Sequence, residues 1–370
     1  MRILIVGGGI AGLAMARALE LQGFSAELIE QRADVAQGGT GLYLPGNAAR
    51  ALQGLGLLDS VAARAMPIAT QRILDSRGRP LSVTRTEDVW SSCGPCLALP
   101  RAALHGALRD SLVGTGLRFG TSITGIEPLG ETSRVTFSDG TLGEYDLVIG
   151  ADGINSQVRQ RLFPAVRPSY TGNLCWRFIT KDSVGVEGWT VMLADGMSLL
   201  AIPIGNGEVY VYADMVVSES QVPGKLTELP REALLAAFAA PLAPLIARQP
   251  DHAQVHVSPI EQVVMHEWVR GNRVLIGDAA HASSPSMAEG AGMAMEDALV
   301  LAATLGSTSS ISEALGDYTR RRKPRVDWVQ QQCAARDKMR RLPGWGRTML
   351  LKLVGNRLYK RSYTPLTRPL

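Results

Sequence analysis

Cysteine is scarce in this sequence, and no apolar run is long. Four cysteines among 370 residues are too few for a disulfide framework in a chain of this length, and they suit a reduced, cytoplasmic setting. The most apolar later run, residues 234–247, is interrupted by two prolines and is shorter than the roughly 20 residues that span a bilayer. The apolar residues 3–6 end at a glycine-rich turn, which excludes a signal peptide. We therefore expect a cytoplasmic protein without an integral membrane segment.

Disorder and fibrous structure are excluded by the composition. The chain is 46% hydrophobic and 19% charged, which is enough apolar material for packed cores. Its 39 glycines follow no three-residue period, so the chain is not collagen-like. The sequence contains no internal repeat, no low-complexity tract and no set of metal ligands. Its length favours two packed domains.

Acidic residues are almost missing from the last part of the chain. From residue 320 onward, 15 Lys and Arg face two acids, so this segment carries +13 and residues 1–319 carry −9. The acidic body argues against a nucleic-acid binder. The basic segment can contact an anionic surface or a nicotinamide phosphate, or it can be a solvated helical end that faces the acidic body.

The first 30 residues have the pattern of a strand, a turn, a helix and a second strand. Residues 3–6 form a continuous apolar run, as expected of a strand buried on both faces. Residues 13–22 have helical apolar spacing, and Gly23 follows them as a helix-ending glycine. Residues 26–29 predict the second strand. Two later apolar runs, 146–149 and 273–276, predict further strands that end in Gly/Asp loops.

The turn at residues 7–12 (GGGIAG) has the spacing of a dinucleotide-binding loop. Gly7 permits the tight turn, Gly9 lets a pyrophosphate approach the backbone, and Gly12 lets helix and strand pack closely. The N-terminus of the following helix presents unpaired N–H groups to the phosphates. Glu30, at the end of the second strand, can accept hydrogen bonds from ribose hydroxyls or can be an exposed strand-end acid. The pattern predicts an adenine dinucleotide site.

A second ligand edge is predicted near residue 278. Asp278 follows a strand, where ligands gather in open α/β sheets, and its carboxylate can hold a hydroxyl of a ribityl chain. Residues 289–292 (EGAG) open a later helix, where Gly290 and Gly292 expose N–H groups. These groups can stabilise the negative charge of a reduced flavin. Because an NAD enzyme has no use for this second edge, the sequence favours FAD.

Three motifs in this order resemble the fingerprints of the single-component FAD monooxygenases, which share the para-hydroxybenzoate hydroxylase fold. They are residues 7–12 with Glu30, the pair Asp152 and Gly153, and Gly277-Asp278 followed by Pro285. The likeness extends to about residue 335. The region around Trp176 looks most like the salicylate hydroxylase and tetracycline-inactivating branch.

The resemblance implies an activity and a set of contacts. NAD(P)H docks transiently and reduces FAD, which reacts with O2 to a C4a-hydroperoxide and passes an OH to an electron-rich aromatic or polycyclic substrate. The implied assembly is a monomer or homodimer, and Pro285 is implied to lie against the flavin. The implied FAD-binding residues are Gly7, Gly9, Ala11, Gly12, Glu30, Arg32, Leu42, Arg101, Ile123, Asp152, Asp278, Gly290, Ala291 and Gly292.

The expected fold is α/β, with a Rossmann-like FAD-binding domain, an inserted and mostly antiparallel β substrate domain, and C-terminal helices. Alternation in stretches such as residues 208–212 indicates half-exposed antiparallel strands in the insert. The predicted boundaries are 1–70, 96–165 and 266–330 for the FAD domain, 71–95 and 166–265 for the substrate domain, and 331–370 for a basic helical segment.

Substrate contacts are harder to place. Tyr210 and Tyr212 alternate onto one face of a predicted strand and are candidates for catalysis, although such a face is more often plain sheet packing. Trp176 and Arg177 can bind an aromatic acid by stacking and charge, or can be a packing pair of a strand. His256, among the other candidates, is expected to be structural. The pair Cys93 and Cys96 is not expected to be redox-active, because it lies in a Gly/Pro loop before another strand.

Two positions depart from the family pattern. The residue after the ribose acid is Gln31 rather than the usual Arg, and Arg32 lies one position further on. Glu289 replaces a common Gln before the flavin helix. An ionised carboxylate there would disfavour a reduced flavin anion, so we expect Glu289 to turn toward substrate or solvent. The open alternatives are another flavoenzyme of this fold, such as a reductase, an epoxidase or a halogenase, and an FAD-dependent binding protein without turnover.

Overall fold

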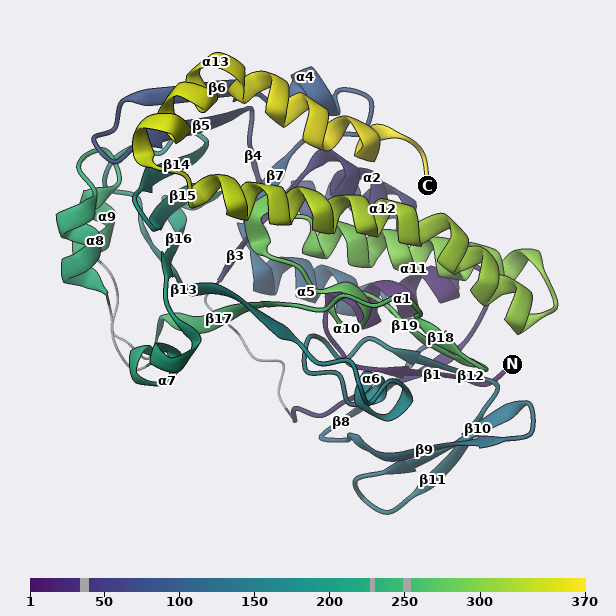
Figure 1. Ribbon diagram of the computed structural model, residues 1–370. Helices are drawn as coiled ribbons and strands as arrows, with labels where there is room; N and C mark the ends of the chain where they lie inside the picture. The colour runs from purple at the N-terminus through teal and green to yellow at the C-terminus, as the bar shows by residue number, and fades with distance from the viewer. Residues whose placement is uncertain (34–39, 227–229, 249–253) are drawn as a thin grey trace.

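The computed structural model describes residues 1–33, 40–226, 230–248 and 254–370. A six-stranded sheet with helices forms one part of the molecule, and a seven-stranded sheet forms the other (Figure 1). The two long C-terminal helices run along the upper side of both parts in that view. The observed architecture is the α/β fold with an antiparallel insert that the sequence predicts.

The six-stranded sheet forms where the predicted apolar runs lie. Its strands are parallel except for the pair β18–β19, and β1 pairs with both β2 and β12. All four residues of β1 are buried, which explains their uninterrupted apolar sequence. In spatial order the strands are β18 (Val269–Arg270), β19 (Arg273–Leu275), β12 (Leu147–Gly150), β1 (Ile3–Val6), β2 (Ala26–Glu30) and β8 (Gly116–Phe119).

Helices of this part place several loops at the carboxyl ends of the strands. Helix α1 packs on α11, and α11 packs in turn on α2 and on the long helix α12. The helices are α1 (Ile10–Leu21), α2 (Gly46–Gly54), α3 (Leu58–Ala62), α5 (Arg101–Asp110), α6 (Gln157–Leu162), α10 (Asp278–His281) and α11 (Gly290–Ser307). Two small sheets complete it: β3 (Gly41–Leu44), β7 (Leu97–Pro100) and β4 (Met66–Pro67), and β11 (Leu142–Tyr145), β10 (Thr132–Phe137) and β9 (Ile123–Leu129).

The seven-stranded sheet is antiparallel apart from the β14–β5 pair. One face contributes to the large core shared with the first sheet, and the other face packs with α8 (Arg231–Ala237) and α9 (Ala243–Ala247) around a separate core. The short elements α7 (Val222–Lys225) and α4 (Glu87–Trp90) lie outside the sheet. Its strands in order are β17 (His256–Gln262), β13 (Ser169–Lys181), β16 (Glu208–Val216), β15 (Met197–Gly205), β14 (Trp189–Ala194), β5 (Thr70–Asp75) and β6 (Pro80–Arg85).

The basic C-terminal segment forms two long helices, α12 (Ile311–Arg340) and α13 (Gly344–Tyr363). Contrary to a fully solvated end, the first part of this segment is built into the protein: Arg322 is 1% exposed and binds two carboxylates of α11. Helix α13 packs against β6 and α4. None of the helices in the described ranges is long and apolar enough to cross a membrane.

Candidate active site

The glycine turn before α1 is shaped by backbone contacts. Gly7 has φ +112°, and a Cβ on it would lie 2.5 Å from the carbonyl oxygen of Ala151. A Cβ on Gly12 would lie 1.9 Å from the carbonyl oxygen of Gly7. By contrast, among the residues that the structure describes, a Cβ on Gly9 would meet nothing within 4 Å. The two outer glycines therefore serve the packing of the turn, and the middle glycine leaves open space in front of the helix N-terminus.

The ribose-binding acid predicted at Glu30 lies beside this turn. Its carboxylate accepts hydrogen bonds from the backbone N–H of Gly8 at 2.7 Å and of Arg32 at 2.9 Å. Its carbonyl oxygen accepts from the N–H of Thr121 at 2.9 Å, which brings the segment before Ile123 to the same edge. On the other side, His105 of α5 hydrogen-bonds the carbonyl of Gly8 at 2.8 Å. The turn is thus fixed from both flanks.

The third motif packs directly on the first. Gly277 has φ +58°, and a Cβ on it would lie 2.9 Å from the Cβ of Ala11 in α1. Its N–H donates to Asp297 at 2.9 Å, and His281 binds the same carboxylate oxygen at 2.6 Å. Asp278, the next residue, is exposed. The loop therefore places the exposed Asp278 side chain beside the glycine turn, and we call the part of the surface between Gly9, Asp278 and Gly290 the opening.

A buried network of charged side chains connects α11 to α12. Arg322 donates to Asp297 at 2.8 Å and to Glu296 at 2.6 Å, and Arg325 donates to Glu296 at 2.7 Å. Burial alone would raise the pKa of Asp297, but His281 and Arg322 lower it to about 2. These ionised groups fix the first half of α12 against α11, so the loop at Gly277 depends on residues far away in the sequence.

Several charged groups converge where the predicted FAD contacts meet. Arg101 is exposed at the start of α5. Its backbone N–H donates to the carbonyl of Thr40 at 2.9 Å, and Thr40 is two residues before Leu42 of β3. Crowding by protein atoms lowers the pKa of Arg101, and Asp278 opposes this effect through its negative charge. Arg177 and Arg32 also act on Arg101 electrostatically. Arg101, Asp278 and Arg32 therefore lie close enough to influence one another, and their contacts with the cofactor stay predictions.

The predicted second motif has a more local role. Both carboxylate oxygens of Asp152 are engaged at the start of α6, where they accept from Ser156 and from the N–H groups of Gln157 and Val158. Asp152 is nevertheless adjacent to the first turn, because a Cβ on Gly7 would lie 2.8 Å from its Cα. A contact of Asp152 with the cofactor stays a prediction, as do the contacts of Ile123 and Leu42.

On the sheet face that belongs to the larger core, Arg177 and Tyr210 lie near this opening. Arg177 is half-buried and donates to the sulfur of Cys175 at 3.2 Å. Tyr210 packs on β3, because a Cβ on Gly41 would lie 2.4 Å from its Cβ. His256 pairs with Arg177 across β17 and β13 and so shares its face. Burial lowers the pKa of His256, and Arg177, Arg101 and Arg32 lower it further.

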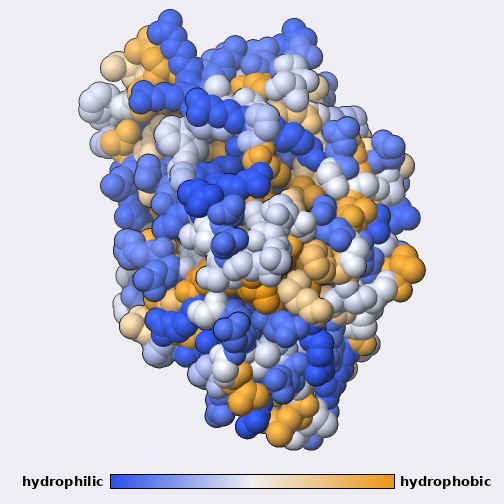
Figure 2. Space-filling model, turned by 90° about the vertical axis from the view of Figure 1, so that its right-hand side faces the viewer, coloured by the Kyte–Doolittle hydropathy of each residue, from blue (hydrophilic) through white to orange (hydrophobic). Residues whose placement is uncertain are grey.

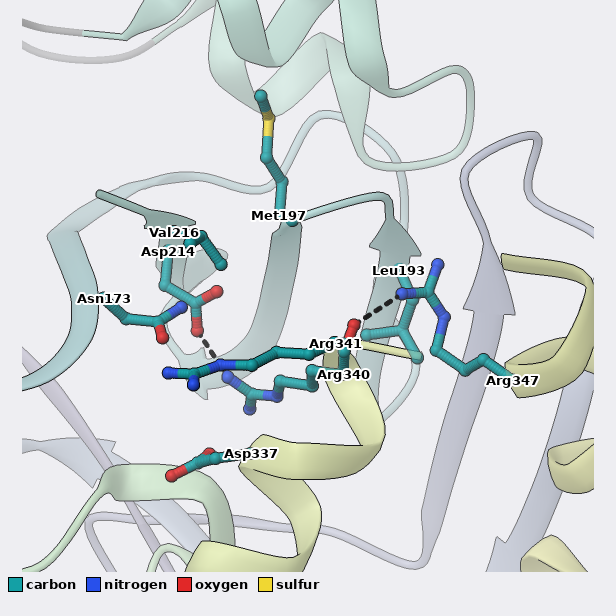
Figure 3. Close-up of a pocket in the computed structure, with 10 residues that line it drawn as sticks. Asn173, Leu193, Met197, Asp214, Val216, Asp337, Arg340, Arg341 and Arg347 are labelled. Atoms are coloured by element: carbon teal, nitrogen blue, oxygen red, sulfur yellow. Dashed lines mark hydrogen bonds and ion pairs between the residues drawn. The ribbon is translucent and has the colours of Figure 1, made fainter. Parts of the chain in front are cut away.

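Tyr212 is bound differently from Tyr210. Its hydroxyl donates to Asp214 at 2.8 Å, and Arg340 at the end of α12 binds the same carboxylate oxygen at 2.6 Å. Figure 3 shows this ion pair at a small cavity, where Arg347 donates to the carbonyl of Arg340 at 3.0 Å. The cavity volume of about 10 Å³ suffices for about one water. Tyr212 therefore joins the sheet to α12, and its hydroxyl proton is held by a structural ion pair.

The expectation that Trp176 and Arg177 bind substrate together is not met. Trp176 is 1% exposed and packs in the separate core with Phe238 and Leu245 of the α8–α9 region. Neighbouring residues of a strand point to opposite faces, so only one of the two can face the opening. The structure places Arg177 there.

Glu289 does not turn toward solvent, and this corrects the expectation from the sequence. It is 2% exposed and accepts a hydrogen bond from Asn47 of α2 at 2.8 Å. Burial raises its pKa to about 8, and the nearby Glu296 adds to the increase. Oε1 of Glu289 and Oδ1 of Asn47 are both buried, and neither has a hydrogen-bond partner in the described part of the chain. A proton on Glu289 would remove its negative charge from the flavin side, which resolves the conflict that the sequence poses.

Other predicted residues lie near the start of α11 in the sequence and are exposed or half-buried. Pro285 is exposed in the short turn at Pro285–Met287, and Gly290 and Ala291 lie at the start of α11. A Cβ on Gly292 would lie 3.1 Å from Oε2 of Glu289, so Gly292 serves packing. Cys93 and Cys96 are buried and free, and burial raises the pKa of Cys96 to about 12, which agrees with an unreactive pair.

Asn47, Asp297 and Arg322 are not among the predicted site residues. Asn47 and residues 321–325 belong to the family resemblance, but only the fold shows that they act on the site through α2 and α12. His256 was set aside as structural, although the alternation of β17 could have placed it on the face of Arg177 once the pairing register was known.

The residues present fit an FAD molecule. The N-termini of α1 and α11 have no side-chain cap, and neither helix has an acid in its first turn. Open space lies before Gly9, and a Cβ on Gly290 would meet only Asp278, at 4.0 Å. Glu30 would hold the ribose, the N-terminus of α1 the pyrophosphate, and Asp278 the ribityl chain. Within the described residues, no cluster of side chains could hold a metal ion.

Comparisons with known proteins agree with this fit. A family model described as "FAD binding domain" matches residues 1–333. The chain is 34% identical to the 2-heptyl-3-hydroxy-4(1H)-quinolone synthase of Pseudomonas aeruginosa, over 98% of each chain. It is 32% identical to the aurachin C monooxygenase/isomerase of Stigmatella aurantiaca, over 86% of this chain and 84% of that one. HpxO of Klebsiella pneumoniae, solved with FAD and uric acid, has the same fold at a TM-score of 0.86 and 23% identity, with 100% of this chain and 97% of that chain covered.

The glycine turn, the acid at the end of β2 and the Gly/Asp loop before α10 thus occur in a chain that a family model matches over most of its length. By these findings the chain belongs to the FAD-binding-domain family and is an FAD-dependent monooxygenase.

Proposed function

We propose that this enzyme uses NAD(P)H and O2 to hydroxylate an aromatic heterocycle of the 4-quinolone type that carries an alkyl chain. The quinolone named for the relative from Pseudomonas aeruginosa supports this class. The observation that carries the proposal is the pairing of Arg177 with His256 on the sheet face beside Tyr210. Four free cysteines, all buried, support a cytoplasmic setting.

Bound FAD would supply the redox chemistry by accepting electrons from the nicotinamide and using O2 as the oxygen source. Arg177 holds a permanent positive charge at the opening. Burial acts to lower its pKa, but Cys175 and the two tyrosines raise it above the ordinary value. This charge can stabilise the negative oxygen of a deprotonated substrate, whose ring is then rich in electrons.

His256 is suited to remove the substrate proton. Its lowered pKa keeps the imidazole neutral at pH 7, so one ring nitrogen can accept a proton. Buried apolar side chains of the larger core, including Ile202 and Ile204 of β15, lie on the same side of the sheet. They provide the apolar surroundings that an alkyl chain requires and that keep water away from the reaction.

The test is turnover with two matched substrates. The FAD-loaded enzyme should oxidise NAD(P)H faster with 2-heptyl-4(1H)-quinolone than with salicylate, and it should yield a hydroxylated quinolone. Arg177→Met should lower kcat/KM by roughly tenfold or more, because a hydrogen bond to a charged group contributes about 1.5–3 kcal/mol. Arg320→Met, an exposed change, is the control. Hydroxylation of salicylate alone, or an unchanged kcat/KM in Arg177→Met, would contradict the proposal.

A further inference from the structure

Helix α13 exposes a row of apolar side chains. Trp345 is 77% exposed, Met349 58% and Leu353 71%. Their spacing of four residues places them on one side of the helix. Leu342, just before the helix, is 42% exposed. Contiguous exposed apolar residues of this size on a folded protein indicate a site of interaction.

The same row continues in basic residues. Arg357 and Arg361 follow Leu353 at the same spacing, and Lys352 lies beside the row. Residues 338–370 contain nine Lys and Arg and no acid. Among the described residues, no carboxylate lies at ion-pair distance from Lys352, Arg357 or Arg361. We call the row from Trp345 to Arg361, together with Lys352, the outer α13 face.

The opposite side of α13 fixes the helix to the protein. Leu351 is 3% exposed and packs with Leu81 of β6, and a Cβ on Gly355 would lie 2.7 Å from the hydroxyl of Ser82. The hydroxyl of Tyr359 accepts a hydrogen bond from Trp90 at 3.1 Å. Folding therefore does not need the outer side chains. The helix lies at the upper edge of the molecule in Figure 1, and apolar and hydrophilic atoms stand side by side at the upper end in Figure 2.

We propose that the outer α13 face docks on the surface of an anionic lipid bilayer. Trp345, Met349 and Leu353 would enter the boundary between headgroups and acyl chains, and the basic residues would contact the lipid phosphates. A nucleic acid would leave the apolar row unused and would meet the acidic body. A second copy of this chain would bring two basic rows together, which like charges oppose. The inference is independent of the substrate of the enzyme.

Vesicle binding tests the proposal. The full FAD-loaded chain is mixed with vesicles of equimolar phosphatidylglycerol and phosphatidylcholine, or of phosphatidylcholine alone, and bound protein is measured by sedimentation. We expect binding to the anionic vesicles, weakening as salt increases, and little binding to the neutral ones. Trp345 fluorescence, isolated by subtraction of the Trp345→Phe variant, should shift to shorter wavelength on binding.

Three variants separate the contributions. Trp345→Ser with Leu353→Ser should weaken binding by roughly tenfold or more through lost apolar burial. Lys352→Gln with Arg357→Gln and Arg361→Gln should weaken it similarly through lost attraction to the lipid. The control is Leu142→Ser, which changes a 64% exposed leucine in β11 and should bind like the wild type. Thermal unfolding and turnover with a water-soluble substrate should be unchanged in all three.

The proposal is overturned if the wild type ignores anionic vesicles or binds neutral ones equally well. It is also overturned if Leu142→Ser loses as much binding as the Trp345 variant. A dimer in solution that Trp345→Ser dissociates would show that a second copy covers the outer α13 face instead.

Discussion

The two glycine-bearing helix starts of this site are prepared in different ways. Before α1, the shape comes from close backbone contacts: a Cβ on Gly12 would lie 1.9 Å from the carbonyl oxygen of Gly7. Before α11, the shape comes from buried side chains: Asp297 holds the loop of Gly277, and Arg322 of α12 holds Asp297. Both helix starts lack a side-chain cap and leave N–H groups for a ligand.

This difference explains why a short sequence motif marks the start of α1 but no short motif marks the start of α11. Steric closeness between neighbours in the chain requires glycine at fixed positions, so it appears as a local pattern. A charge network requires partners that only the fold brings together, and Arg322 is 25 residues from Asp297. The first site is therefore sensitive to added volume, and the second is sensitive to the loss of one charge.

The largest expected effect is at the second site. Among the described residues, Arg322→Met would leave Asp297 with His281 as its one remaining ion-pair partner and Glu296 with Arg325 as its own. Removing one member of a buried ion network typically costs about 3–5 kcal/mol. We expect this loss in the free energy of unfolding, measured with urea, together with reduced FAD content.

The matched control for that change is Arg320→Met, on the same helix. Arg320 is exposed and pairs with the exposed Asp317, and such surface pairs contribute about 0–1 kcal/mol. If both variants lose the same small amount of stability, the charge network does not hold the start of α11.

At the first site, added volume should matter. Gly12→Ala forces a backbone shift, and overpacking of this kind costs about 1–3 kcal/mol, measured by urea unfolding without FAD. Gly9→Ala meets open space, so its unfolding should change by less than about 0.5 kcal/mol, whereas its affinity for FAD should fall. The control Gly316→Ala, in α12, also meets open space among the described residues. Equal effects of Gly9→Ala and Gly12→Ala on stability would refute the distinction.

The most conservative substitution sharpens the comparison at Glu289. Because burial raises its pKa from 4.5 to about 8, the folded protein keeps a proton that the unfolded chain releases above pH 4.5. Stability therefore falls as the pH rises from 4.5 to about 8, by at most about 1.4 kcal/mol per pH unit. Glu289→Gln should lack this contribution, and its amide can pair with Asn47.

Urea unfolding of both proteins between pH 5 and 9 measures this difference. Glu187→Gln, which changes an exposed glutamate, is the control and should keep the pH dependence of the wild type. Parallel pH profiles for Glu289→Gln and the wild type would show that Glu289 is ionised in the folded protein.

The parts of the site that local sequence patterns determine could be predicted, and the parts that depend on distant residues could not. The strand, turn and helix at residues 3–21 and the position of Glu30 follow from apolar periodicity and glycine spacing, which are local. Trp176 and Arg177 were grouped although alternation separates them, so that error was avoidable. Glu289 was misplaced because nothing near it in the sequence indicates that Asn47 and Glu296 surround it.

The two faces of strand β13 contact different parts of the protein. Leu174, Trp176 and Phe178 lie in the core with α8 and α9, whereas Cys175 and Arg177 lie on the side of the opening. Substitutions at the even-numbered positions can therefore change stability without changing substrate specificity. Substitutions at the odd-numbered positions can change substrate specificity with less effect on stability. An engineer, or natural selection, can alter what this enzyme accepts without rebuilding the sheet that carries it.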